Sequence, residues 1–307
     1  SERYPSQKEI ESYLNFVANE LSLFRSISFS SKVIELIYND SKNLWSVKLE
    51  NGKLFQCRFI ITALGCLSTS NEPLIPGIKN FCNKVIHSSS WPEELKLHDK
   101  NIGIIGTGST GIQIIPEIAD KAKSLIVFQR TANYSIPAKN HKIYKETREN
   151  HKLNFELLKA IAIENRHGHP WPHSLTEASS VSKKIRTQIL DKAWRKGGLS
   201  FRDCFSDINN NNFANLAVTK FIREKIEKTV KNKSKAKILS NFNHPFGAKR
   251  PALDIKYFET FNKENVKLID LKKHKIRTAD KYGIWVDQEY HPMDILIFAT
   301  GFDAITG

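Results

Sequence analysis

Three glycines, at positions 106, 108 and 111, sit where one apolar pattern gives way to another. The four residues before them, Ile102–Ile105, are apolar or glycine, which is typical of a strand buried on both faces. Beyond them, apolar residues recur at helical spacing, at Ile112, Ile114, Ile115, Ile118 and Ala119. A Gly-x-Gly-x-x-Gly spacing between a strand and a helix predicts a dinucleotide-binding turn.

Each glycine has its own expected role in that turn. Gly106 permits the tight bend, Gly108 lets the backbone approach a pyrophosphate, and Gly111 allows close packing of helix on strand. The pyrophosphate is then expected to lie on the amides and positive dipole end of the helix. Thr107, Ser109 and Thr131 are candidates for hydrogen bonds to phosphate.

The next apolar segment, Ser124–Arg130, predicts a second buried strand that ends in a cation. A site for NAD would carry Asp or Glu about here, to bind the ribose 2′-hydroxyl group. Arg130 instead suits a 2′-phosphate, which a guanidinium can bind through two hydrogen bonds. We therefore predict NADPH as the cofactor. The alternative is a solvated arginine at a strand end.

The net charge of +15 raises the question of nucleic-acid binding. The lysines of the later part are scattered along polar faces, without aromatic residues on which bases could stack. A positive surface also attracts an anionic cofactor. We expect no nucleic-acid partner.

The four cysteines, at 57, 66, 82 and 204, contain no Cys-x-x-Cys pair. This argues against a thiol–disulfide flavoenzyme and against a cysteine zinc site, and it fits a reducing, cytoplasmic setting. No apolar run reaches the length of a membrane span. The chain starts at Ser1 without Met and stops just after a glycine motif, so we expect it to be a piece of a longer protein.

The early part of the chain predicts one amphipathic helix, Ser6–Leu21, with Ser6 and Glu9 as a capping box. Three strands should follow, at 32–38, 44–49 and 54–62. The last of them runs through Phe59–Ala63 into Leu64-Gly65, an apolar strand ending at glycine. Pro73–Gly77 is a stiff connection, where we place a domain boundary.

From Asn140 to Asn243 the apolar spacing becomes helical, and strands resume at Val266–Ile269, Ile284–Val286 and Asp294–Ala299. The helical block therefore reads as an insertion within one α/β domain. It contains His167, His169 and His173, which could be taken for a metal cluster. Without a flanking carboxylate or cysteine, and with prolines between them, they read as a loop, so no metal is expected.

A family resemblance enters here. The segment Phe81-x-Asn83-x-x-x-His87-x-x-x-Trp91-Pro92 resembles the fingerprint of type I Baeyer–Villiger monooxygenases, with Asn83 in place of a glycine. The likeness continues through Phe128–Thr131, Pro245–Pro251 and Ala299–Asp303, and it spans essentially the whole chain. Asn tolerates positive φ better than most residues, so the turn at Asn83 is expected to survive.

The resemblance implies a two-dinucleotide-binding-domain flavoprotein, α/β in class, with a Rossmann-like NADPH domain carrying a helical insertion. Residues 71–138 and 246–292 would form the NADPH-binding domain, and 139–245 the insertion. Residues 1–70 and 293–307 would be a partial FAD-binding domain, with Ala63, Leu64, Gly65 and Asp303 near FAD. The family's own first glycine motif, which holds FAD, would lie upstream of Ser1.

The resemblance also implies the reaction, in which NADPH, FAD and O2 together insert one oxygen beside a ketone carbonyl and give an ester or lactone. Arg250 would stabilise the anionic species, and Lys249 would bind the 2′-phosphate together with Arg130. Of the fingerprint residues Phe81, His87 and Trp91, His87 would organise the linker of the NADPH domain, and Trp91 would be a packing anchor. Two alternatives stay open, a flavin N- or S-oxygenating monooxygenase and an isolated NADPH-binding module that is inactive alone.

Overall fold

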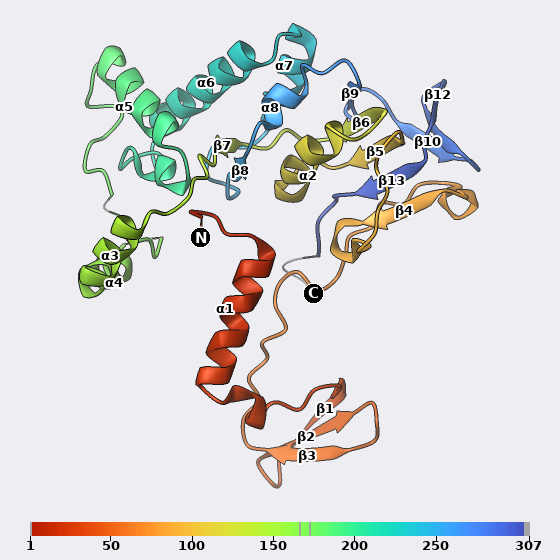
Figure 1. Ribbon diagram of the computed structural model, residues 1–307, viewed down its shortest axis with the longest axis vertical. Helices are drawn as coiled ribbons and strands as arrows, with labels where there is room; N and C mark the ends of the chain where they lie inside the picture. Colours follow the sequence, from red (N-terminus) through yellow and green to blue (C-terminus); the bar gives the residue numbers. More distant parts are fainter. Residues whose placement is uncertain (1, 166, 172, 304–307) are drawn as a thin grey trace. The chain divides into compact units, whose positions relative to one another are not determined.

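The computed structural model describes residues 2–165, 167–171 and 173–303, and it divides the chain into two compact units (Figure 1). Unit 1 comprises Ser1–Gly65 and His141–Ile143, and unit 2 comprises Cys66–Asn140 and Tyr144–Gly307. Of the described residues, none belongs to a helix long and apolar enough to cross a membrane.

Unit 1 contains one long helix and a small antiparallel sheet. Helix α1 (Gln7–Glu20) begins where predicted, and the Ser6 side chain accepts a hydrogen bond from the Glu9 amide. A single 3₁₀ turn, η1 (Leu23–Ser26), precedes strands β1 (Val33–Asn39), β2 (Leu44–Leu49) and β3 (Leu54–Cys57). These pair in the order β1-β2-β3.

The strand predicted at Phe59–Ala63 does not form. β3 ends at Cys57, and the following apolar side chains are exposed, Phe59 at 81% and Ile61 at 92%. An apolar run becomes a buried strand only where other strands pair with its backbone, and no described strand does so here. The apolar pattern alone was therefore insufficient to predict a strand at Phe59–Ala63.

Unit 2 is built on a five-stranded parallel sheet, as the sequence predicted. Its strands are β4 (Lys84–His87), β5 (Asn101–Ile105), β6 (Ser124–Gln129), β9 (Val266–Asp270) and β13 (Ile295–Phe298), in the order β4-β13-β5-β6-β9. Because β9 and β13 complete a sheet begun by β5 and β6, the helical block interrupts one α/β domain.

The place of β13 corrects part of the expected domain division. Residues 293–307 were assigned to the FAD-binding part, but Ile295–Phe298 pair with Ile102–Ile105 on one side and with Lys84–His87 on the other. The run is buried on both faces because it is a central strand of the nucleotide-domain sheet.

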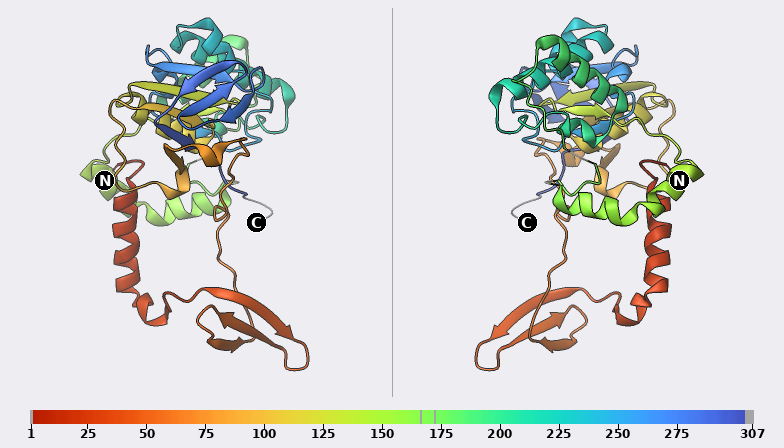
Figure 2. Two further views of the ribbon diagram at one scale, coloured as in Figure 1. Left: turned by 90° about the vertical axis from the view of Figure 1, so that its right-hand side faces the viewer. Right: turned by 90° about the vertical axis from the view of Figure 1, so that its left-hand side faces the viewer.

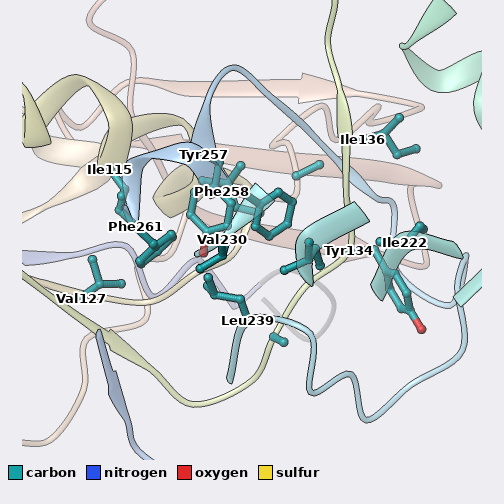
Figure 3. Close-up of a cluster of buried hydrophobic side chains, with 14 of the residues drawn as sticks. Ile115, Val127, Tyr134, Ile136, Ile222, Val230, Leu239, Tyr257, Phe258 and Phe261 are labelled. Carbon is teal, nitrogen blue, oxygen red and sulfur yellow. The ribbon is translucent and has the colours of Figure 1, made fainter. Parts of the chain in front are cut away.

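Alternate residues of these strands enter two separate cores. Ile102, Ile104, Val127 and Ile297 face a large core with α2 (Ser109–Ala119) and the helices of the block. Figure 3 shows part of it, where Ile115 and Val127 lie near Tyr257, Phe258 and Phe261. Ile105, Phe128, Leu296 and Phe298 face the other core, beside three antiparallel strands.

Those three strands are β10 (Ile276–Ala279), β11 (Gly283–Val286) and β12 (Glu289–Pro292). In the two opposite views of Figure 2 they come to the front in one, and the green and cyan helices of the block in the other. The parallel sheet is thus covered on both faces, as its apolar strands require.

The helical block contains α3 (Lys145–Leu153), α4 (Phe155–Glu164), α5 (Lys183–Lys196), the 3₁₀ helix η4 (Leu199–Asp203), α6 (Asn212–Thr229) and α7 (Lys233–Leu239). Short strands stand at its two ends, β7 (Ser135–Pro137) before it and β8 (Ala252–Asp254) after it, and they pair in parallel. A short helix, α8 (Tyr257–Thr260), leads on to β9.

Candidate functional site

The glycine turn lies between β5 and α2, at the carboxyl edge of the sheet, and two of its three glycines are crowded by backbone atoms. Gly106 has φ +111°, and a Cβ there would lie 2.3 Å from the Ala299 carbonyl oxygen. A Cβ on Gly111 would lie 2.2 Å from the Gly106 carbonyl oxygen. A side chain at position 106 would push the turn away from Ala299, and a side chain at position 111 would push α2 away from Gly106.

Gly108 differs from both, because a Cβ there would meet no atom within 4 Å. It is the N-cap of α2 and makes no side-chain cap hydrogen bond. The first amides of a helix have no partner within that helix, and the dipole makes this end positive. Open space over a helix N-terminus is the shape and charge that a pyrophosphate requires.

The end of β6 brings a cation to the same edge. Arg130 follows the last residue of β6 and is exposed. The Thr107 hydroxyl is buried and donates to the Thr131 carbonyl at 3.1 Å, so it ties the glycine turn to this segment. Its proton is therefore used inside the protein, unlike the exposed Ser109 hydroxyl, which stays a candidate for phosphate.

The second pair of cations, Lys249 and Arg250, stands exposed on the loop before β8. The Asn215 side chain clamps this loop, since its Nδ2 donates to the Phe246 carbonyl at 2.8 Å and its Oδ1 accepts from the Phe246 amide at 3.0 Å. The Tyr134 hydroxyl donates to the His244 carbonyl at 3.1 Å. The loop is thus held by residues that lie 31 or more positions away in the sequence. Sequence reasoning missed Asn215 and Tyr134 because no motif links either residue to this loop.

Strand pairing relates the two cation-bearing segments. Ser135 pairs with Ala252, and the Ala252 amide donates to the Tyr134 carbonyl at 3.0 Å. Because the two strands are parallel, residues 130–134 and 249–251 enter the ladder from the same end. The topology therefore brings Arg130 and the Lys249-Arg250 pair to one end of β7 and β8.

The electrostatics of this region are cationic. Burial, followed by the charge of Lys249, lowers the pKa of His244, which favours the neutral imidazole. Burial also lowers the pKa of His169, and the charges of Arg202 and Arg250 act in the same direction. Because both imidazoles favour the neutral form, the fixed positive charge near them comes from Lys249, Arg202 and Arg250.

The fingerprint residues lie at and after β4. Phe81 is buried in the second core. The chain bends at Asn83 without a positive φ, and the Asn83 Nδ2 donates to the Met293 carbonyl at 2.8 Å. His87 is buried, with Nδ1 2.7 Å from the Ser89 hydroxyl.

The Trp91 side chain is 39% exposed in the described part of the chain, so its role as a packing anchor stays a prediction. The four residues expected near FAD are also accessible. Leu64 is 81% exposed beside Ala63 and Gly65 in unit 1, and Asp303 in unit 2 is exposed, with its amide donating to the Thr69 carbonyl at 2.9 Å.

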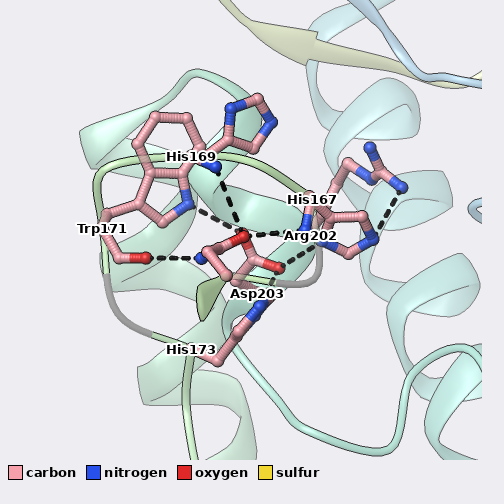
Figure 4. Close-up of polar contacts among 7 residues, drawn as sticks. His167, His169, Trp171, His173, Arg202 and Asp203 are labelled. Carbon is pink, nitrogen blue, oxygen red and sulfur yellow. Dashed lines mark hydrogen bonds and ion pairs between the residues drawn. The ribbon is translucent and has the colours of Figure 1, made fainter. Parts of the chain in front are cut away.

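The histidine-rich loop was read as lacking a carboxylate, and the fold supplies one. Asp203, at the end of η4, has Oδ1 3.2 Å from His167 Nδ1 and 3.0 Å from His173 Nδ1 (Figure 4). Sequence reasoning missed Asp203 because it lies 30 positions beyond His173, in a different element.

Comparison with known proteins gives a consistent result. The family model for L-lysine 6-monooxygenase/L-ornithine 5-monooxygenase matches residues 1–195. Cyclohexanone 1,2-monooxygenase of Acinetobacter sp. is 37% identical over 99% of this chain and 56% of its own length. Phenazine N-monooxygenase PhzNO1 of Lysobacter antibioticus is 33% identical over 99% of this chain and 57% of its own.

Solved structures agree. Oxidized steroid monooxygenase bound to NADP superimposes with a TM-score of 0.94 at 36% identity, over 99% of this chain and 58% of that one. The chain thus spans little more than half the length of the relatives it matches. The family model matches more than half of the chain, so the chain belongs to the flavin monooxygenase family, and over its whole length it is similar to Baeyer–Villiger monooxygenases.

Proposed function

We propose that this chain is the NADPH-binding portion, with part of the FAD-binding portion, of a Baeyer–Villiger monooxygenase that converts a ketone and O2 into an ester or lactone. The observation that supports this most is the combination of an open Gly108 over a helix N-terminus with Arg130 at the end of the adjacent strand. The helix N-terminus at Gly108 can bind a pyrophosphate, and the guanidinium of Arg130 can bind a 2′-phosphate.

The residues present fit NADPH. The α2 amides would hold the pyrophosphate, and Arg130 and Lys249 would hold the 2′-phosphate at one end of the β7–β8 pair. FAD, when bound, supplies the capacity to activate O2. Ala63, Leu64, Gly65 and Asp303 are the proposed FAD contacts of this chain.

Arg250 is the proposed catalytic residue. The attack of an oxygen nucleophile on a carbonyl places negative charge on the carbonyl oxygen, and a fixed cation stabilises that charge. Arginine keeps its charge in an apolar pocket, where lysine can lose its proton. The clamp that Asn215 places on Phe246 fixes the loop that carries Arg250.

The proposal is tested by product analysis with the chain joined to the sequence that flanks it in its gene. Supplied with NADPH, FAD and cyclic or aryl ketones under ¹⁸O2, the protein should yield an ester or lactone with one labelled oxygen. Arg250→Ala should reduce turnover by about 10²–10³-fold and leave NADPH binding within a few fold. Full turnover in Arg250→Ala would remove Arg250 from the mechanism.

Arg130 tests the cofactor assignment separately. Arg130→Glu should weaken NADPH binding by about tenfold or more, because a charge-assisted hydrogen bond of ~1.5–3 kcal/mol is lost and a repulsion is added. NADH binding should stay nearly unchanged, and exposed Lys123→Glu serves as the matched charge control. An equal loss for NADPH and NADH would contradict the 2′-phosphate role.

N-oxygenation is the second candidate, favoured by the match of residues 1–195 to the lysine/ornithine monooxygenase model and by the phenazine relative. The family model does not reach Arg250, whereas the whole-chain relatives do. Products confined to hydroxylamines, N-oxides or sulfoxides, with no ester, would establish this alternative.

A further inference from the structure

A cluster in the helical block brings together three potential metal ligands that the proposed oxygenase reaction does not use. His167 and His173 come from one loop and Asp203 from η4. One ligand atom from each residue lies within 4.8 Å of the other two. Figure 4 shows the two imidazole rings directed at the carboxylate.

The spacing fits a small divalent cation. Nitrogen and oxygen ligands bind Zn²⁺ at about 2.0–2.2 Å, so neighbouring ligand atoms of a tetrahedral site lie roughly 3.3 Å apart. The two histidine Nδ1 atoms lie 3.2 Å and 3.0 Å from Asp203 Oδ1. These two separations already match a tetrahedral site, and the third, between the two histidine ligand atoms, lies within 4.8 Å, so binding one ion requires at most a small closing movement of the two rings.

The surroundings resemble the outer layer of a metal centre. Asp203 is buried, and its second oxygen, Oδ2, accepts from Trp171 Nε1 at 2.7 Å, which fixes the direction of Oδ1. The Asn165 side chain donates to the Trp171 carbonyl at 2.7 Å and accepts from the His167 amide at 2.8 Å. Hydrogen bonds to ligating groups orient them and raise metal affinity.

One neighbour opposes a cation. Arg202 Nη2 lies 3.3 Å from His167 Nε2. A guanidinium only donates, so Nε2 accepts and the ring proton resides on Nδ1, pointing at Asp203. For Nδ1 of His167 to bind a metal ion, the ring proton must move to Nε2. Arg202 must then turn away, because Nε2 no longer accepts a hydrogen bond. Arg202 should therefore weaken metal binding, an effect that substitution can measure.

We propose that His167, His173 and Asp203 form a site for a divalent transition metal ion of the zinc type, with water completing the coordination. The site reverses the sequence-based expectation of no metal, because the missing carboxylate arrives from η4. It does not depend on the proposed oxygenase function.

Titration with Co²⁺ provides the test, since its visible absorption reports coordination without any turnover. The protein should develop ligand-field bands with one equivalent of Co²⁺, and Zn²⁺ should displace them. Ligation by nitrogen and oxygen predicts no strong near-ultraviolet thiolate band from the four cysteines.

Variants decide whether these residues are the ligands. His173→Ala and Asp203→Asn should raise the Co²⁺ dissociation constant at least 100-fold, and Trp171→Phe about tenfold. Arg202→Leu should lower it, whereas His98→Ala, at an exposed histidine elsewhere, should leave it unchanged. Circular dichroism confirms that each variant is folded. Absence of the bands at millimolar Co²⁺, or equal binding by His173→Ala and the parent chain, would establish a purely hydrogen-bonded cluster and overturn the proposal.

Discussion

Two segments of this chain have the same sequence pattern, an apolar run that ends at a glycine, and they fold differently. Asn101–Gly106 contains the buried strand β5, with parallel neighbours on both sides. In Phe59–Gly65 no strand forms, and Phe59, Ile61 and Leu64 are exposed. The comparison shows that hydrophobicity permits a buried strand, whereas hydrogen-bonding neighbours determine whether it forms.

The largest difference between the two segments should appear on truncation of isoleucine. Ile104 is 0% exposed and Ile61 is 92% exposed. Ile104→Ala should lower the free energy of unfolding by about 2–5 kcal/mol, and Ile61→Ala by less than about 0.5 kcal/mol. Urea unfolding of each variant measures both values. Equal losses would show that Ile61 is covered in solution.

The glycines that end the segments give the next comparison. Both have positive φ, +111° at Gly106 and +73° at Gly65, but only Gly106 is crowded by backbone atoms. Gly106→Ala should cost about 2–4 kcal/mol, from strain and overpacking together. Gly65→Ala should cost about 1 kcal/mol, from conformational strain alone. Chemical denaturation distinguishes them, and similar costs would contradict the close approach to Ala299.

The smallest effect concerns the carboxyl group of Asp254, which is buried in unit 2. Burial raises the pKa of Asp254 above its usual value of 3.8, although the Ser135 hydroxyl donates to its Oδ2 at 2.8 Å. A raised folded-state pKa means that the folded state favours the protonated form. Stability linked to Asp254 is therefore complete below the unfolded pKa and is lost as pH rises through the folded one.

Asp254→Asn removes that titration and keeps an acceptor for Ser135. The variant should gain stability relative to the parent chain as pH rises from about 4 toward neutrality, by no more than about 2 kcal/mol. Thermal unfolding at a series of pH values measures the difference. A pH-independent difference would show that Asp254 titrates alike in the folded and unfolded states.

The sequence predicted features whose causes are local. Ser6 capping α1, the strand-to-helix turn at Gly106 and the helical spacing of apolar residues within 140–243 all depend on neighbours within a few positions. The interruption of one sheet by the helical block was also predicted, because strand-like apolar segments resume after it, at the positions of β9 and β13.

Features produced by contacts between distant residues could not be predicted in this way. The clamp of Asn215 on Phe246 and the approach of Asp203 to His173 join positions about 30 residues apart. The exposure of Trp91 and of Phe59–Leu64 depends on which surfaces cover them, and periodicity carries no information on that.

The short ladder between β7 and β8 has a consequence for how such a chain can diversify. Since Ser135 and Ala252 are joined directly, the polypeptide between them forms a closed excursion of more than one hundred residues whose two ends are fixed. The entropy cost of such an excursion grows only slowly with its length. Insertions and deletions in the connections between α3, α4 and α5 can therefore accumulate while the β7–β8 ladder keeps its register and Asn215 of α6 keeps its hold on the loop before β8.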